Sequence, residues 1–386
     1  QQDIDELEKD IHSSQDFSKI QGRFNTRLSL SSANADEVIK KRLLEKNDSG
    51  KDAVQLLYTS EVKASLRNKI NFSDGTISLK KYDTLKDFSE FYPMIPYQLD
   101  LLQQVFTKIR ENSSAGKHFA SGERNLLGAV QYAALEYAEK DLGILIPFQT
   151  FYGHLDQGLD HSVRATIIKA QSTPTLQSFD VDVLKVLYLI RYLKSVPSTV
   201  ENITTLMLDE LDADRLKLTE NITAALDRLT KEYLVQRTGL EYLFLTNEEQ
   251  DINREINHMD IPTSKMQSYI GEMIYDTVLE MKKYKYVPFA EKKTVAYDFD
   301  CAKWIDESAR GNATAEIGIH VVTPYSDDYR TREELQQLSS RESRLVIALG
   351  DSGTFYDDTM MLLKINEYLR SQSSKQNSGI KREIID

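Results

Sequence analysis

The spacing of apolar residues changes near residue 286, and this change constrains the fold more than any other feature of the chain. Before it, apolar residues recur mostly at helical intervals, and the run from Val183 to Leu193 is typical of a buried helix. After it, Ile317–Val322 and Leu345–Leu349 are short apolar runs typical of buried strands, and a helix is expected over Thr359–Leu369. The pattern predicts a mainly α-helical chain with a smaller α/β part.

Composition limits the classes of function. The 386 residues suffice for two or three domains, and the formal net charge is −12. This acidity argues against general binding to nucleic acids or acidic membranes, because phosphate contacts need surplus Lys and Arg, although a local basic face remains open. Cys301 is the only cysteine, which excludes an intramolecular disulfide and fits a reducing cytoplasm. No apolar run approaches the ~20 residues that span a bilayer, so we expect a cytoplasmic protein without membrane contact.

Composition and periodicity also suggest domain boundaries. Within the first helical region, we expect helices over Gln98–Arg110 and Arg124–Lys140. The predicted segments are a helical domain at 31–170, a linker at 171–178, a further domain at 179–246, a charged helical arm at 247–285, a small α/β domain at 286–370 and a disordered tail at 371–386. For residues 247–285, a pair of packing helices is the alternative to an arm that reaches a partner.

Residues 179–246 have the element order of a winged-helix domain. Three helices are expected, the third over Asp214–Tyr233, and Leu234–Leu245 is expected to form a hairpin wing. The acidic and basic residues of the third helix balance to zero, which is unusual for a helix that reads DNA. We therefore expect a structural or protein-contacting winged helix.

Phosphate-binding motifs are missing from the sequence. A P-loop needs Gly-x-x-x-x-Gly-Lys-Ser/Thr, because bare amides and a lysine must surround the phosphates at a helix start. Ser49–Asp52 and Ala115–His118 come nearest, and both lack the first glycine and the hydroxyl residue. No strand ends in the adjacent Asp-Glu pair of a Walker B motif. We expect that the chain alone holds no cofactor and does not hydrolyse ATP.

Ser352 follows a predicted strand in the sequence Ala348–Gly353, which resembles the Gly-Asp-Ser opening of certain esterases. Such a serine needs a general base, and no histidine lies downstream of His320. A turn that joins the strand to the next helix is the favoured interpretation.

His154 and His161 lie seven residues apart with two aspartates between them. On a helix they could share a face, which would permit metal binding. Their spacing is not that of a known zinc motif, so exposed polar positions are the favoured interpretation, and no metal site is predicted.

Arg124 opens an amphipathic helix in the sequence Gly122-Glu123-Arg124. This resembles the sensor 2 region of AAA+ lid domains, where an arginine at a helix start reaches the γ-phosphate. A guanidinium suits this role because its charge is permanent and its donors are forked. The alternative is a capped helix with an exposed arginine.

Three longer strings resemble the P-loop ATPase family of the BREX phage-defence system, BrxC or PglY. They are Arg23–Leu44, Phe91–Leu102 and Ala115–Arg124. The resemblance is close over roughly residues 20–160, looser through the winged-helix region and thin after residue 290.

The resemblance implies an AAA+/STAND-like ATPase of bacterial phage defence, of which this chain would be the C-terminal part. The Walker A and B motifs of the family lie upstream of the matched strings, so ATP and Mg would be bound by the parent protein, which would be the active ATPase. Residues 1–30 would be the end of the ATPase core, and 31–170 an AAA+-like helical lid.

Carried over to this sequence, Arg124 would be the sensor-like lid residue, and Arg23 and Arg27 would be trans-acting arginines at the core-to-lid junction. The implied role is regulation or assembly, through other BREX proteins, including a DNA methyltransferase, or through self-association into a homo-oligomer. The alternative is a DNA-binding winged-helix module of the same complex, which would use the wing and Arg237.

Overall fold

The computed structural model describes eight stretches of the chain: 32–73, 79–112, 122–280, 283–286, 297–315, 317–327, 331–351 and 353–371. The chain divides into two compact units, with the boundary between Asp251 and Ile252. Helices dominate, and a small mixed sheet lies in the second unit, as the change in periodicity predicted. Within the described stretches, no helix is long and apolar enough to cross a membrane.

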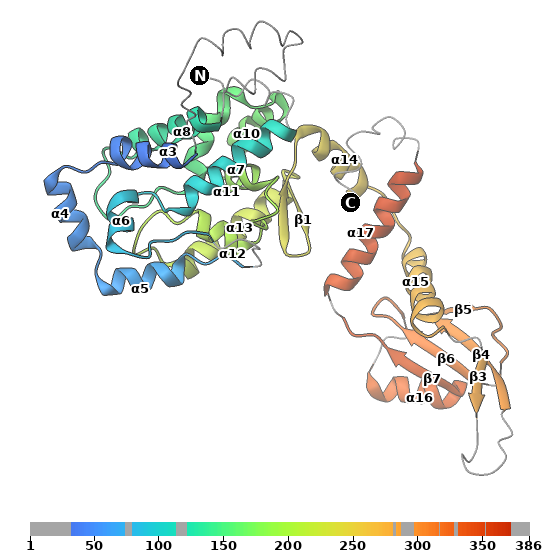
Figure 1. Ribbon diagram of the computed structural model, residues 1–386. Coiled ribbons are helices and arrows are strands. Elements are labelled where there is room, and N and C mark those ends of the chain that lie inside the picture. Colours follow the sequence, from blue (N-terminus) through green and yellow to red (C-terminus); the bar gives the residue numbers. More distant parts are fainter. Residues whose placement is uncertain are drawn as a thin grey trace, which may run out of the picture. The chain divides into compact units, whose positions relative to one another are not determined.

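Unit 1 is built of helices and one hairpin (Figure 1). Its first elements are α3 (Ser32–Val38), the π-helical turn η1 (Ile39–Leu43), α4 (Asp48–Leu57), α5 (Ser60–Lys69), α6 (Leu85–Phe91), α7 (Tyr97–Asn112) and α8 (Gly122–Glu136). They are followed by η3 (Phe148–Phe151), α9 (Tyr152–Leu155), η4 (Asp156–Gly158), α10 (His161–Ser172), α11 (Ser178–Ile190), α12 (Val200–Leu206) and α13 (Arg215–Lys231). The helices predicted at 98–110 and 124–140 are α7 and α8.

The helix α11 lies largely inside unit 1. Nine of its thirteen residues are buried. It contacts α10, α12, α13, η3 and the second strand of the hairpin. Such a broad apolar surface must be covered by other elements, and the Asp182–Lys185 ion pair marks the part of α11 that stays partly exposed.

Asp180 is a charged residue inside this buried helix. Its side chain is fully buried and closes a capping box at the start of α11 by accepting from the backbone N–H of Gln177, at 2.9 Å. Arg228 of α13 donates to both carboxylate oxygens, from Nε at 2.8 Å and from a terminal nitrogen at 2.6 Å. This two-point ion pair satisfies the carboxylate and fixes α13 against α11.

The C-terminal end of α5 is tied to α12 and α13 by polar contacts. The side chain of Asn202, fully buried, accepts from Ser73 N at 2.9 Å and donates to Ser73 O at 3.2 Å. Lys69 Nζ donates to Leu211 O at 2.9 Å, and Arg215 donates to the carbonyl oxygen of Lys69. One hydrophobic core extends from Ala35 to Phe244. The predicted linker at 171–178 therefore lies inside one compact unit, between α10 and α11.

The hairpin consists of β1 (Val235–Thr238) and β2 (Glu241–Phe244), which pair antiparallel with Val235 opposite Phe244. Gly239 in the turn has φ of +60°, a conformation that glycine adopts without steric cost. Three helices followed by a hairpin are present as the sequence predicted, whereas the assignment of these elements to a winged-helix domain stays a prediction.

Unit 2 contains a sheet with helices. The helix α14 (Asn247–Asn257) spans the boundary, and unit 2 continues with α15 (Thr263–Glu272), the π-helical turn η5 (Met273–Val278), β3 (Lys283–Tyr286), β4 (Tyr297–Ile305), β5 (Ser308–Arg310), β6 (Ile317–Val322), α16 (Arg332–Glu342), β7 (Arg344–Ala348) and α17 (Gly353–Arg370). The strand order is β3-β4-β6-β7, and β5 pairs with β4. The strands β4, β6 and β7 are parallel, while β3 and β5 run antiparallel to β4.

The core of unit 2 forms between the sheet and its helices. Ile305 and Val321 of the sheet share a buried cluster with Met266 and Ile270 of α15 and Tyr275 of η5. The described residues of 247–286 form two helices, a π-helical turn and a strand, and the packing of α15 on the sheet fits the alternative of packing helices. The predicted strands at 317–322 and 345–349 correspond to β6 and β7.

We expect Arg228→Ala to lower the free energy of unfolding by about 2–4 kcal/mol, because it leaves the buried carboxylate of Asp180 without its cation. The matched control is Lys217→Ala, which removes an exposed cation from the same helix and should change stability by less than about 0.5 kcal/mol. Urea unfolding followed by circular dichroism measures both. Equal, small losses in the two variants would contradict the structural role of the ion pair.

Candidate functional site

The described parts of the segments that carry the family resemblance come together in unit 1. The helix α8, whose first turn is the described end of the string 115–124, packs against α3 and η1 from the string 23–44 and against α7, which begins within the string 91–102 (Figure 1). Their apolar faces belong to one core, in which Ile39 and Leu101 are fully buried together with Leu126. Three segments that are far apart in the sequence thus form one region.

Of the three arginines predicted to contact nucleotide, the structure describes Arg124. Arg124 lies in the first turn of α8, which begins at Gly122, so the predicted helix start is confirmed. Arg23 and Arg27 lie outside the described residues. The roles of these arginines as sensor and trans-acting residues stay predictions.

Two glycines let α8 and α9 approach closely. A Cβ atom at Gly128 of α8 would lie 2.5 Å from Cε1 of His154, and a Cβ atom at Gly153 of α9 would lie 2.4 Å from the hydroxyl oxygen of Tyr132. Each ring therefore fills the space that the opposite glycine leaves. This packing fixes α8 against α9 over the helical turn from Gly128 to Tyr132.

His154 is half-buried in this contact, which lowers its pKa, whereas His161 is exposed at the start of α10. Exposure was expected for both histidines and holds only for His161, because His154 packs against Gly128. Among the described residues, no group of three or more His, Cys, Asp or Glu side chains could hold a metal ion.

Three lysines surround one glutamate beside this region, and we call Lys40, Lys46, Lys86 and Glu90 the lysine cluster. Lys40 Nζ lies 3.5 Å from one carboxylate oxygen of Glu90, and Lys86 Nζ lies 3.7 Å from the other. Lys46 Nζ lies 3.4 Å from the backbone carbonyl oxygen of Glu90. Burial lowers the pKa of Lys46 to about 8, although Glu90 opposes this shift.

Capping and helix packing place these lysines. Asn47 follows Lys46 and caps α4 by accepting from the backbone N–H of Gly50 at 2.7 Å, which fixes the chain direction at Lys46. Lys40 lies in η1, and its ammonium group is 4.3 Å from the ring centre of Phe91 at the end of α6. This cation–π contact holds Lys40 against the same helix that carries Glu90.

A pair of aspartates adjoins the cluster. Burial raises the pKa of Asp36 in α3, and the nearby carboxylate of Asp100 in α7 raises it further, whereas Lys80 and Lys40 lower it. Lys80 Nζ pairs with Asp100 at 3.1 Å. Shifted pKa values in one cluster are typical of functional sites, though ion-pair networks produce them too.

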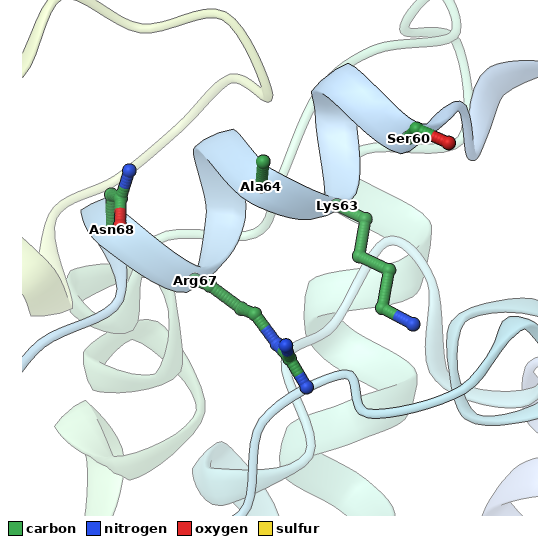
Figure 2. Close-up of a pocket in the computed structure, with 5 residues that line it drawn as sticks. All are labelled: Ser60, Lys63, Ala64, Arg67 and Asn68. Atoms are coloured by element: carbon green, nitrogen blue, oxygen red, sulfur yellow. The ribbon is translucent and has the colours of Figure 1, made fainter.

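A shallow cavity of about 300 Å³ lies along α5 (Figure 2). The residues that line it all belong to this helix, and Lys63 and Arg67, one turn apart, extend to the same side. The Ser49–Asp52 sequence, by contrast, lies at the start of the exposed and capped helix α4. The Ala115–His118 sequence lies outside the described residues.

The third helix of the winged-helix prediction, α13, uses two of its cations internally. Arg228 pairs with Asp180, and Arg215 donates to Thr205 Oγ1 at 3.0 Å and to Glu201 O at 3.2 Å. On the hairpin, exposed Arg237 donates to Gly239 O at 3.1 Å. Because Arg215 and Arg228 are bound within the protein, α13 offers fewer cations to a nucleic acid than its sequence alone indicates.

In unit 2, the predicted turn lies between β7 and α17, and Ser352 itself lies outside the described residues. His320 of β6 is buried, and its Nε2 atom lies 2.7 Å from the carbonyl oxygen of Asp306. The carboxylate of Asp306 accepts from the backbone N–H and the hydroxyl of Thr323, at 2.6 and 2.8 Å. These bonds tie His320 and Asp306 into the end of the sheet.

The last third of the chain matches a known family. Residues 259–386 match the family described as BREX ATP-binding protein BrxC 4th domain with six-stranded beta sheet. The described part of this region contains five strands in one sheet. No solved structure matches the chain. The match supports membership of the BrxC family, and it covers the part of the chain where the resemblance of the sequence was thin.

Because the pKa of Lys46 is about 8, roughly half of its amino groups are neutral at pH 8, against about one per cent or less for an ordinary lysine. We expect Lys46 to react with an acylating reagent at pH 8 several times faster than Lys108, which is half-exposed and paired with Glu111. Mass spectrometry of the labelled peptides measures both rates. The rate for Lys46 should level off above pH 9, and a rate that rises in parallel with that of Lys108 up to pH 10 would contradict the lowered pKa.

Proposed function

We propose that the chain is part of a BREX ATP-binding protein of the BrxC family, in which unit 1 couples the nucleotide state of an ATPase core to partner binding or self-association. The match of residues 259–386 supports the family. The strings of unit 1 that resemble the same family support the extension of this assignment to the rest of the chain.

The observation that carries the proposal is the packing of α8 against α3 and η1. In the proposed protein, the chain leaves the ATPase core just before α3. Ala35 and Ile39 on that side are buried in the same core as Leu126 and Val130 of α8. Because close-packed side chains transmit displacement, a movement of the core would shift α3 and α8 together.

Arg124 is the proposed contact with the nucleotide. Its place in the first turn of α8 suits an arginine that reaches out from a helix start toward a phosphate. The nucleotide and its magnesium would be held by the Walker motifs of the parent protein. Other BREX proteins, or a second copy of the same protein, would then respond to the position of unit 1.

The internal bonds of Arg215 and Arg228 argue against the alternative of a DNA-binding module. The overall charge of −12 points the same way. Arg237 remains the residue on which DNA binding by the wing would depend.

We expect Arg124→Ala in the parent ATPase to reduce the rate of ATP hydrolysis by at least tenfold while the fold persists, because a cation that stabilises the γ-phosphate is lost. The matched control is Arg237→Ala, an exposed arginine of the same unit, which should leave hydrolysis unchanged. Steady-state phosphate release measures both. An unchanged rate for Arg124→Ala would remove this residue from the mechanism, and salt-sensitive DNA binding that is lost in Arg237→Ala would favour the DNA-binding alternative.

A further inference from the structure

The lysine cluster carries more positive charge than the carboxylates beside it balance. Three ammonium groups lie within 4 Å of oxygen atoms of Glu90, at 3.4 Å from its carbonyl oxygen and at 3.5 and 3.7 Å from its carboxylate. The other carboxylate that acts on the cluster is Asp36, which interacts with Lys40. Like charges that share one counterion repel one another, so a further anion at the cluster would be stabilising.

Lys46 has a partly buried side chain whose ammonium group makes one long hydrogen bond within the described residues. An ammonium group has three N–H donors. In the part of the chain that the structure describes, the Glu90 carbonyl oxygen is the acceptor of Lys46 Nζ, at a long 3.4 Å. The side chain is partly buried, so water replaces the missing acceptors less fully than at an exposed lysine.

We propose that the lysine cluster binds an oligophosphate group, either inorganic triphosphate or the phosphate tail of a nucleotide. Lysines act as point charges and suit phosphate oxygens, whereas recognition of a carboxylate by a two-point contact favours arginine. Without a ligand, the carboxylate of Glu90 pairs with Lys40 and Lys86. The bound phosphate group replaces this carboxylate as the partner of the lysines. This inference goes beyond the proposed function, because it gives the chain a phosphate site of its own, apart from Arg124.

Isothermal titration calorimetry with sodium tripolyphosphate, without magnesium and at low salt, tests the site on the full chain. We expect saturable binding that Lys46→Met and Lys40→Met each weaken by roughly fivefold or more. The methionine keeps the apolar stem of the lysine, so the packing of the partly buried side chain is preserved. Lys108→Met, which removes a lysine outside the cluster, should bind as the unchanged chain does.

Glu90→Gln should change the affinity for tripolyphosphate in the opposite direction from the lysine variants. Removal of the competing carboxylate should tighten binding of tripolyphosphate, whereas damage to the fold would weaken it. Circular dichroism spectra of all variants verify that they are folded.

The protonation of Lys46 provides a second readout. A bound anion favours the charged form and raises the pKa of Lys46, so binding at pH 8 should take up a fraction of a proton. Titrations in two buffers of different ionisation enthalpy measure this uptake, which should disappear in Lys46→Met.

ATP without magnesium distinguishes the two sources of the phosphate. Equal affinity for ATP and tripolyphosphate would assign the site to the phosphate tail alone, and tighter binding of ATP would add a nucleoside contact. The proposal is overturned if the chain shows no saturable binding of tripolyphosphate, or if Lys46→Met and Lys40→Met bind as tightly as the unchanged chain. Either result leaves the test of Arg124 unaffected, because that test measures hydrolysis in the parent protein.

Discussion

The burial of most of α11 is the constraint on which unit 1 depends. Because nine of its thirteen residues are buried, the helices around it and the hairpin after it must cover most of its surface. The buried carboxylate of Asp180 in α11 accepts two hydrogen bonds from Arg228 of α13. This ion pair also fixes the position of α13 against α11. The helices that resemble an ATPase lid and those that resemble a winged helix consequently share a single core.

The sequence predicts well what depends on local pattern. The helices α7 and α8, the hairpin and the strands β6 and β7 all come from strong periodicity or turn signals. The role of α15 was left open between packing and a reaching arm, because the apolar positions Met266 and Ile270 indicate an inward face without showing that the sheet covers it. The strand β4 was missed because charged residues alternate with its aromatic ones.

Much of the candidate site was beyond the reach of sequence patterns. The spacing of Lys86 and Glu90 by four residues on α6 is a local signal for an ion pair. Lys40 and Lys46 lie more than forty residues earlier in the chain and reach Glu90 only through the packing of η1 and α4 near α6. Burial of Lys46, which lowers its pKa, is likewise a property of the folded chain. The place of Arg124 at a helix start, by contrast, was predictable from the sequence, and its role stays a prediction.

The central claim is that the region of α3 and α8 responds to nucleotide in the parent ATPase. Hydrogen–deuterium exchange of that protein with and without Mg-ATP tests this claim most directly, because it reports on the backbone of each helix. The account predicts that the amides of α3 and of the first turns of α8 exchange more slowly when Mg-ATP is bound. Unchanged exchange in both helices, with protection confined to other parts of the protein, would contradict it.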